Sequence, residues 1–138
     1  MEPLPRGSET ILLVDADPET RKLAAFMLQK RGYPVMEARS GADALKLCDS
    51  DNARPDLLLT EILMPSMSGT DLAARLQALH PGLKVLFMSR ADYNRVGRRL
   101  KIDRETEFLQ KPFTMVQIAG KVRRALDARP SAVGAHVG

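Results

Sequence analysis

Polar residues that can bind a metal ion or a phosphoryl group end four of the apolar runs in this 138-residue chain. The runs end in Asp15 and Asp17, in Glu61, in Ser89 and in Lys111. Acids can hold Mg²⁺, a metal and an ammonium can neutralise phosphoryl oxygens, and a hydroxyl can donate a hydrogen bond. The candidate chemistry is therefore phosphoryl transfer to a carboxylate.

Each of these residues also has a purely structural interpretation. Asp15 and Asp17 fit a turn followed by a helix N-cap. Glu61 fits the end of a strand, Ser89 a second cap, and Lys111 a surface charge beside a proline. We nevertheless favour a single functional site made by all of these residues, because the carboxyl ends of parallel strands converge on one rim of a sheet.

The elements that carry these residues alternate between short apolar runs and segments of helical period, which predicts βαβ units on a parallel sheet. We expect five strands, at residues 10–14, 35–38, 56–61, 83–89 and 107–110. Helices are expected at about 18–30, 42–48, 70–79 and 114–128, with a fifth in the polar, weakly periodic segment 91–104. Right-handed crossovers then favour an α/β fold, a flavodoxin-like doubly wound sheet of order 2-1-3-4-5.

Local signals place the ends of these helices. Asp17 is expected to cap the first helix, with a proline at the first helical position and Gly32 just past its end. Ser40 is expected to cap the second helix, and His80 begins the His-Pro-Gly stop of the third. In the first helix, Leu23, Phe26, Met27 and Lys30 recur at helical spacing. In the third helix, Leu72, Leu76 and Leu79 form one apolar stripe. In the last helix, the residues expected to face inward are Met115, Ile118, Val122 and Leu126.

Composition is that of one globular domain, with 44% hydrophobic and 28% charged residues. The single cysteine, Cys48, excludes an internal disulfide, favours a reducing compartment and lies among apolar residues as a buried thiol. His80 and His136 are too far apart to form a zinc site. No segment approaches the length of a membrane span and no signal peptide precedes the domain, so we expect a cytoplasmic protein.

The formal net charge is +4, and the basic excess is concentrated in residues 95–101 and 121–124. Such stretches can face nucleic acid, but neither an aromatic platform nor a helix-turn-helix pattern accompanies them. We therefore favour a solvent-exposed basic face.

Four motifs carry a resemblance to a known family: ILLVD at 11–15, MPSMSG at 64–69, VLFMS at 85–89 and FLQKPF at 108–113. In this order they resemble the receiver domains of two-component response regulators, over residues 10–128. The last two motifs look most like the receivers of hybrid sensor histidine kinases. On this resemblance, residues 1–9 are a leader or interdomain linker, residues 10–128 the receiver domain and residues 129–138 a flexible tail.

The resemblance implies a role for each rim residue. Glu61 takes the phospho-acceptor position, Ser89 that of the hydroxyl switch residue and Lys111 that of the phosphate-binding lysine. Phe108 takes the position of the switch aromatic. The first acid of the pair that would bind Mg²⁺ falls on Asp15.

Three positions depart from the family pattern. Ala16 stands where the second metal-binding acid is expected, and Asp17 is engaged as the expected N-cap. Glu61 replaces an aspartate, which advances the carboxylate by roughly 1.5 Å. A displacement of about 1 Å can cost on the order of a hundredfold in an in-line reaction. Arg90 follows Ser89 in place of a small residue, where it either covers the pocket, pairs with Glu61 or points into solvent.

These departures favour an atypical receiver, or pseudo-receiver, that is not an enzyme and acts through protein–protein contacts. The longer acid at Glu61 would reach towards Lys111 and imitate a phosphorylated aspartate. No cofactor is expected, apart from Mg²⁺ if the residual acids Asp15 and Glu61 still bind it.

The expected partner is a histidine kinase, a phosphotransfer protein or another signalling protein, with no membrane contact and with nucleic acid disfavoured. The resemblance also implies a face made by the fourth helix, fifth strand and fifth helix for homodimerisation or output binding. Because this face carries basic residues, we expect an acidic partner surface. These residues are Arg95, Arg98, Arg99 and Lys101.

Two alternatives remain open. A functional Mg²⁺-dependent receiver would be phosphorylated at Glu61 or at a neighbouring hydroxyl such as Thr60. A phosphatase resembling the haloacid dehalogenase superfamily would use Asp15 and Asp17, which copy the Asp-x-Asp spacing after the first strand. The phosphatase reading leaves Glu61 unexplained and finds no later acidic pair for its metal.

Overall fold

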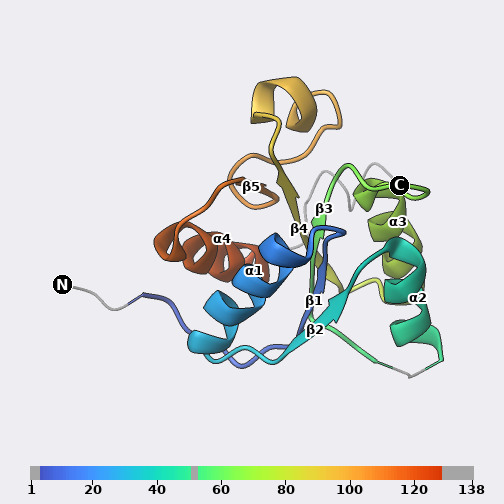
Figure 1. The fold of residues 1–138 in the computed structure, drawn as a ribbon, viewed down its shortest axis with the longest axis horizontal. Coiled ribbons are helices and arrows are strands. Elements are labelled where there is room, and N and C mark those ends of the chain that lie inside the picture. Colours follow the sequence, from blue (N-terminus) through green and yellow to red (C-terminus); the bar gives the residue numbers. More distant parts are fainter. Residues whose placement is uncertain (1–3, 51–52, 129–138) are drawn as a thin grey trace.

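The computed structural model describes residues 4–50 and 53–128, so the tail expected at 129–138 lies outside the described residues. Five parallel strands form one sheet of order β2-β1-β3-β4-β5 (Figure 1). The strands are β1 (Ile11–Val14), β2 (Val35–Ala38), β3 (Leu57–Glu61), β4 (Lys84–Ser89) and β5 (Phe108–Gln110). The doubly wound α/β sheet predicted from the sequence is confirmed.

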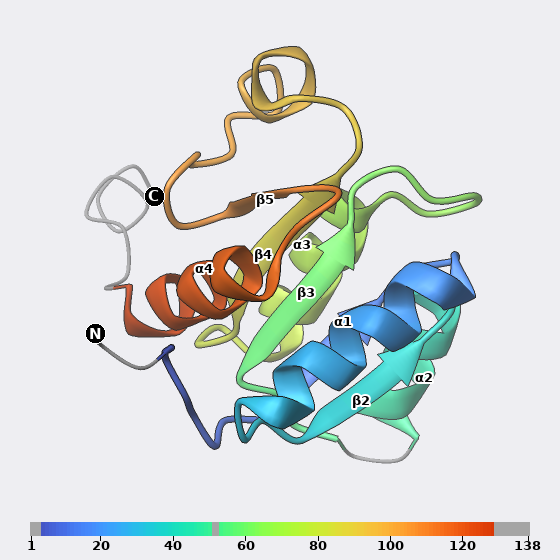
Figure 2. The ribbon, with the colours of Figure 1, turned by 60° about the vertical axis from the view of Figure 1, so that its left-hand side comes forward.

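Helices cover both faces of this sheet (Figure 2). α1 (Pro18–Lys30) and α4 (Met115–Asp127) pack side by side on one face, and α2 (Gly41–Asp49) and α3 (Gly69–Leu79) on the other. The fifth helical segment, η1 (Tyr93–Gly97), is a five-residue π-helix. It lies in the weakly periodic segment and projects beyond the carboxyl end of the sheet (gold in Figure 1).

The apolar strands divide the core into two layers. Leu12 and Leu58 point to the side of α2 and α3, whereas Ile11 and Leu57 point to the side of α1 and α4. Since successive residues of a strand face opposite ways, a sheet covered on both sides needs a continuous apolar run in its central strands. The first strand meets this need because all of its side chains are buried.

The apolar stripe of α1 differs from the sequence pattern. Leu23 and Phe26 are 50% and 55% exposed, and the residues that face the core are Ala24, Ala25 and Leu28. The small alanine side chains let the helix approach the sheet closely, which leaves the larger side chains on its outer flank. The result is an exposed apolar surface on α1.

The other two helices with a predicted apolar stripe, α3 and α4, follow that stripe except near their ends. Leu79 is 59% exposed because it is the last residue of α3. In α4, Ile118 and Val122 are fully buried, whereas Met115 and Leu126 in the end turns are partly buried.

The predicted helix caps form as expected. The Asp17 carboxylate accepts the N–H of Glu19 and the Ser40 hydroxyl accepts the N–H of Asp43. Gly32 follows α1 with a φ of +100°, a conformation that favours glycine. The Asp17 cap fixes the start of α1 at Pro18, shortly after β1 ends at Val14.

Residues 4–9, predicted as a leader, contact the domain. The N–H of Gly7 donates to the carbonyl of Arg31 at 3.0 Å, and the Arg123 guanidinium donates to the carbonyl of Arg6 at 3.1 Å. Arg123 also pairs with Glu9 at 2.5 Å. The segment is thereby attached to the end of α1 and to α4.

We expect Glu9→Gln to lower the free energy of unfolding by about 1 kcal/mol at pH 7, since the pair is partly solvated. The hydrogen bond from Arg123 lowers the pKa of Glu9 from 4.5 to about 2. A carboxylate with a lowered folded pKa contributes its full stability above pH 4.5 and loses it as the pH falls towards 2. Urea unfolding of both proteins at several pH values measures this difference.

The difference between wild type and Glu9→Gln should stay constant down to about pH 5 and then shrink. Asp49→Asn, at an exposed acid without an ion pair among the described residues, is the control and should show no such window. A Glu9→Gln difference that does not change with pH would contradict the assignment of the ion pair.

Candidate functional site

Lys111 lies between two carboxylates at the carboxyl-end rim of the sheet. Its Nζ donates to Asp15 Oδ2 and to Glu61 Oε1, each at 2.6 Å. The side chains of Lys111, Asp15 and Glu61 are 4%, 3% and 14% exposed. The rim therefore brings together the residues predicted from the ends of the first, third and fifth strands, and joins them as one buried ion triad.

The position of Lys111 is set by the pairing of β5 with β4. The Lys111 N–H donates to the carbonyl of Ser89 at 2.9 Å. The side-chain amide of Gln110 donates to the carbonyls of Ser89, Arg90 and Lys111 at 3.2, 2.9 and 3.0 Å. The Lys111–Pro112 peptide bond is cis. These contacts hold the ends of the two strands together and direct the lysine over the rim.

Asp15 is held on several sides. Its Oδ1 accepts the N–H of Asp17 at 2.9 Å, while its other oxygen takes the lysine. The backbone carbonyl of Asp15 accepts Arg21 Nη1 at 2.8 Å, and the buried guanidinium of Arg21 pairs with Glu37 at 3.1 Å. Sequence reasoning missed Arg21. The feature of the sequence that could have identified Arg21 is a basic residue near the start of a helix that follows an acidic strand end.

The Glu61 carboxylate is turned back towards its own loop. Oε1 takes the lysine, and Oε2 accepts the N–H of Ile62 at 3.0 Å. The loop between β3 and α3 returns to the same point, because the Gly69 N–H donates to the Ile62 carbonyl at 2.8 Å. A Cβ on Gly69 would lie 2.1 Å from the Glu61 carbonyl oxygen, so this close approach requires glycine.

Gly69→Ala is therefore expected to lower the free energy of unfolding by about 1–3 kcal/mol, because the clash is with backbone that cannot rotate away. Urea unfolding measures the change. The matched control is Gly120→Ala in α4, where a Cβ meets no atom within 4 Å. Alanine is the better helix former, so this control should gain about 0.5–1 kcal/mol. Equal effects at both sites would argue against the close loop.

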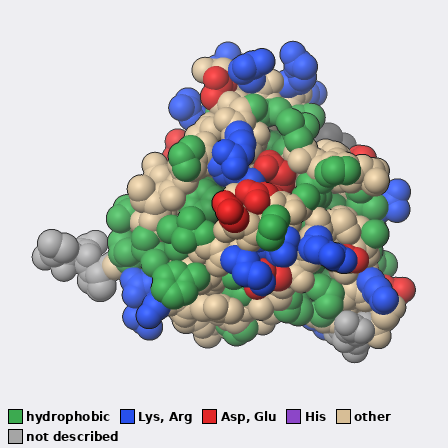
Figure 3. Space-filling view, viewed as in Figure 1, with side chains coloured by type: hydrophobic (Ala, Val, Ile, Leu, Met, Phe, Trp, Pro, Cys, Tyr) green, Lys and Arg blue, Asp and Glu red, His purple; other side chains and the backbone are tan. Residues whose placement is uncertain are grey.

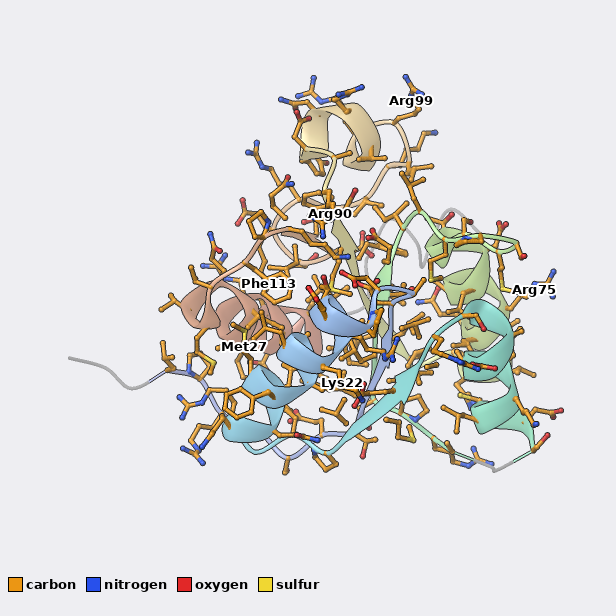
Figure 4. The ribbon with its side chains drawn as sticks, viewed as in Figure 1. Lys22, Met27, Arg75, Arg90, Arg99 and Phe113 are labelled. Atoms are coloured by element: carbon orange, nitrogen blue, oxygen red, sulfur yellow. The ribbon has the colours of Figure 1, made fainter. Side chains whose placement is uncertain are left out.

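The remaining predicted pocket residues do not contact Glu61. The Ser89 hydroxyl accepts the N–H of Ala91 at 3.1 Å, as a cap for the following turn. Arg90 is 72% exposed, and its guanidinium lies 3.8 Å from Asp17 rather than against Glu61. Figure 4 shows Arg90 between η1 and the amino end of α1. Arg90 thus points largely into solvent.

Asp17 serves mainly as a cap. A hydrogen bond from Thr20 at 2.6 Å is the largest cause that lowers the pKa of Asp17, and Arg90 contributes less. The carboxylate is thereby engaged outside the ion triad.

Two buried residues beneath the rim complete the site. Phe108 is 4% exposed and packs edge-to-face on Tyr93, with ring centroids 5.4 Å apart. The Tyr93 hydroxyl donates to the carbonyl of Ile102 at 2.6 Å. Thr60, the neighbouring hydroxyl, is fully buried and donates to the Glu61 carbonyl at 3.0 Å.

The donor set at the rim fits Mg²⁺ poorly. Mg²⁺ requires a near-octahedral shell of oxygens. All four carboxylate oxygens of Asp15 and Glu61 accept hydrogen bonds from the protein, and an ammonium lies between them. Ala16 adds no side-chain oxygen, and the described residues contain no cluster of three or more His, Cys, Asp and Glu suited to a metal.

An apolar patch lies beside the acidic centre of this face. In Figure 3 red carboxylates gather in the middle of the face, and green side chains of α1 and of the start of α4 lie next to them. The patch is made by Leu23, Phe26, Met27, Phe113 and Val116, of which Val116 is 63% exposed. Met27, from α1, and Phe113, from the segment just before α4, lie on the same flank (Figure 4).

Comparison with known proteins agrees with this fold. The family described as response regulator receiver domain matches residues 11–123. The chain is 36% identical over 121 residues to the sensor kinase CckA of Brucella abortus, covering 88% of the chain and 13% of that kinase. It is 30% identical over 118 residues to the response regulator receiver protein CpdR of the same organism, covering 86% of the chain and 97% of CpdR.

The crystal structure of the receiver domain of the hybrid histidine kinase CckA aligns with a TM-score of 0.69 at 29% identity. The alignment covers 86% of the chain and 99% of that domain. The chain therefore belongs to the response regulator receiver domains of two-component signalling, as the sequence motifs predicted. Among the described residues, no helix is both long and apolar enough to cross a membrane.

Proposed function

We propose that this chain is a pseudo-receiver, a signalling module that acts by protein–protein contact without accepting a phosphoryl group at Glu61. The observation that carries the proposal is the 2.6 Å bridge of Lys111 to both Asp15 and Glu61. A phospho-accepting site needs one carboxylate open to attack and an ammonium available for phosphoryl oxygens. At this rim the Glu61 carboxylate and the Lys111 ammonium are already paired with each other.

The same geometry supports a partial imitation of the phosphorylated state. The Glu61 carboxylate meets Lys111 with the negative charge that a phosphoryl group on a shorter aspartate would offer. The Ser89 hydroxyl accepts the N–H of Ala91 and forms no hydrogen bond with Glu61, so the imitation extends to the lysine and not to the hydroxyl. Phe108, at the position of the switch aromatic, is buried. The rim is thus held in one arrangement by internal contacts.

The partner that this module fits best is a histidine kinase or a phosphotransfer protein. The apolar patch beside the rim supports docking, because covering exposed apolar side chains lowers the free energy of the complex. The resemblance to a sensor kinase receiver and to CpdR agrees with such a partner. A homodimer through η1, β5 and α4 is the second arrangement to test. The single buried cysteine fits a reducing compartment such as the cytoplasm.

The test is incubation with Mg²⁺ and acetyl phosphate, followed by intact mass spectrometry. We expect no added phosphoryl group under conditions in which a receiver with an aspartate acceptor is modified. A stoichiometric, base-labile, Mg²⁺-dependent adduct at Glu61 would instead establish the alternative, a functional receiver. Because Thr60 is fully buried, we also expect no adduct there.

A further inference from the structure

A projecting basic segment beside the rim has no counter-charge of its own. Residues 93–101, here called the basic knob, extend beyond the sheet (Figure 1). They carry four exposed cations, Arg95, Arg98, Arg99 and Lys101, of which Arg99 is labelled in Figure 4. Within residues 4–50 and 53–128, none of these four cations forms an ion pair. Cations clustered in this way repel one another and attract an anionic surface.

The nearest acids, Asp92 and Asp103, accept hydrogen bonds from backbone N–H groups and form no ion pair with the four cations. Asp92 accepts the N–H of Arg95 at 2.9 Å. Asp103 accepts the N–H groups of Glu105 and Thr106 at 2.9 and 3.0 Å, and the bond from Thr106 is the largest cause that lowers its pKa. Asp92 is thus directed at the first turn of the knob, and Asp103 at the residues that follow the knob. Its outer surface therefore remains basic.

An apolar groove adjoins these cations. It has a volume of about 650 Å³ and is lined by Leu63, Ala91, Asn94, Arg95, Val96 and Arg99. Leu63, from the loop after β3, is 68% exposed, so its aliphatic side chain is available to a partner at the edge of the groove. The groove thus offers an apolar floor with arginines along one side.

We propose that the groove and the knob bind an acidic protein segment that places one aliphatic side chain between Leu63 and Val96 and carboxylates against the arginines. Charge complementarity argues for the acids, and the exposed Leu63 argues for the aliphatic anchor. The proposal goes beyond the pseudo-receiver function, because it holds whether or not Glu61 accepts a phosphoryl group.

A nucleic acid fits this surface less well. A phosphate backbone would satisfy the cations but would leave Leu63 uncovered. Stacking of unpaired bases needs exposed aromatic rings. The one ring of the knob, Tyr93, packs on Phe108 and donates its hydroxyl to Ile102. The acidic protein segment is therefore the occupant that uses both halves of the site.

The test is a titration of the full chain with three fluorescent probes at low ionic strength. The first probe is a short Glu/Asp-rich peptide with one central leucine, the second has serine in place of that leucine, and the third is a short DNA duplex. We expect the leucine peptide to bind most tightly and the serine peptide about tenfold more weakly. Binding of the leucine peptide should weaken as salt is raised.

Variants locate the binding site on the protein. Leu63→Ser and Arg99→Glu should each weaken the leucine peptide about tenfold. The matched controls are Leu79→Ser and Arg75→Glu, which alter an exposed leucine and an exposed arginine of α3 and should leave binding unchanged. Figure 4 shows Arg75 on α3, well away from Arg99 at the tip of the knob. Thermal unfolding of each variant confirms that it folds.

Three results would overturn the proposal. The leucine peptide shows no saturable binding, it binds no better than the serine peptide, or the α3 controls weaken binding as much as the groove variants do. Tighter binding of the duplex, sensitive to Arg99→Glu but not to Leu63→Ser, would identify a nucleic-acid surface instead.

Discussion

Replacing Lys111 with methionine is expected to lower the free energy of unfolding by about 3–5 kcal/mol at pH 7. The substitution keeps most of the side-chain volume but removes the ammonium that Asp15 and Glu61 share at 2.6 Å. Two carboxylates, 3% and 14% exposed, would then face each other without a counter-charge. For a domain of this size, the loss corresponds to a fall in melting temperature on the order of 10–20 °C.

Chemical and thermal unfolding measure this effect, with Lys101→Met as the control at an exposed lysine. The control should change stability by less than about 0.5 kcal/mol. Adding Glu61→Gln to the Lys111 variant should recover part of the loss, because one of the two facing charges is removed. A Lys111→Met protein within about 1 kcal/mol of wild type would show that the triad is not a structural element.

The same variant tests why the rim fits Mg²⁺ poorly. With the ammonium removed, the two carboxylates form a better site for a divalent cation. Millimolar Mg²⁺ should therefore raise the melting temperature of Lys111→Met while leaving that of the wild type unchanged.

Restoring the family acids is expected to restore phosphorylation. In the double variant Ala16→Asp/Glu61→Asp, the shorter acid withdraws from Lys111 by roughly 1.5 Å and the second acid supplies the missing metal ligand. Lys111 then becomes available for phosphoryl oxygens. We expect the yield of phosphorylated protein from acetyl phosphate and Mg²⁺ to rise by about a hundredfold or more over wild type.

Intact mass spectrometry with and without a chelator measures this yield. Neither single substitution should suffice, because metal binding and acceptor placement are both required and their effects are not additive. A third change, Lys111→Met in the double variant, should abolish the gain. If the folded double variant stays unmodified, the pseudo-receiver state would have to depend on residues other than 16 and 61.

Most of the fold was predictable because its signals are local. The apolar run before Asp15, the cap at Asp17, the cap at Ser40 and the glycine at position 32 each act within a few residues. Parallel strands then force Asp15, Glu61 and Lys111 onto one rim, and the sequence predicted this convergence.

The segment after β4 was not predictable in the same way. Residues 91–104 are polar and weakly periodic, so no local signal favours a regular helix. Their conformation depends on distant contacts, such as the Tyr93 ring on Phe108 and the Tyr93 hydroxyl on Ile102. The exposure of Leu23 on α1 has a similar cause, because the close packing of alanines decides which face of the helix is buried.

By itself, the sequence determined which residues reach the rim and that Glu61 and Ala16 depart from the family pattern. Only the tertiary structure decided what those residues do to one another. Lys111 meets Asp15 across 96 positions of the chain and Glu61 across 50, and each bond depends on a side-chain direction that strand pairing and loop packing impose. Local propensity acts over about four residues, so it cannot specify contacts of this range.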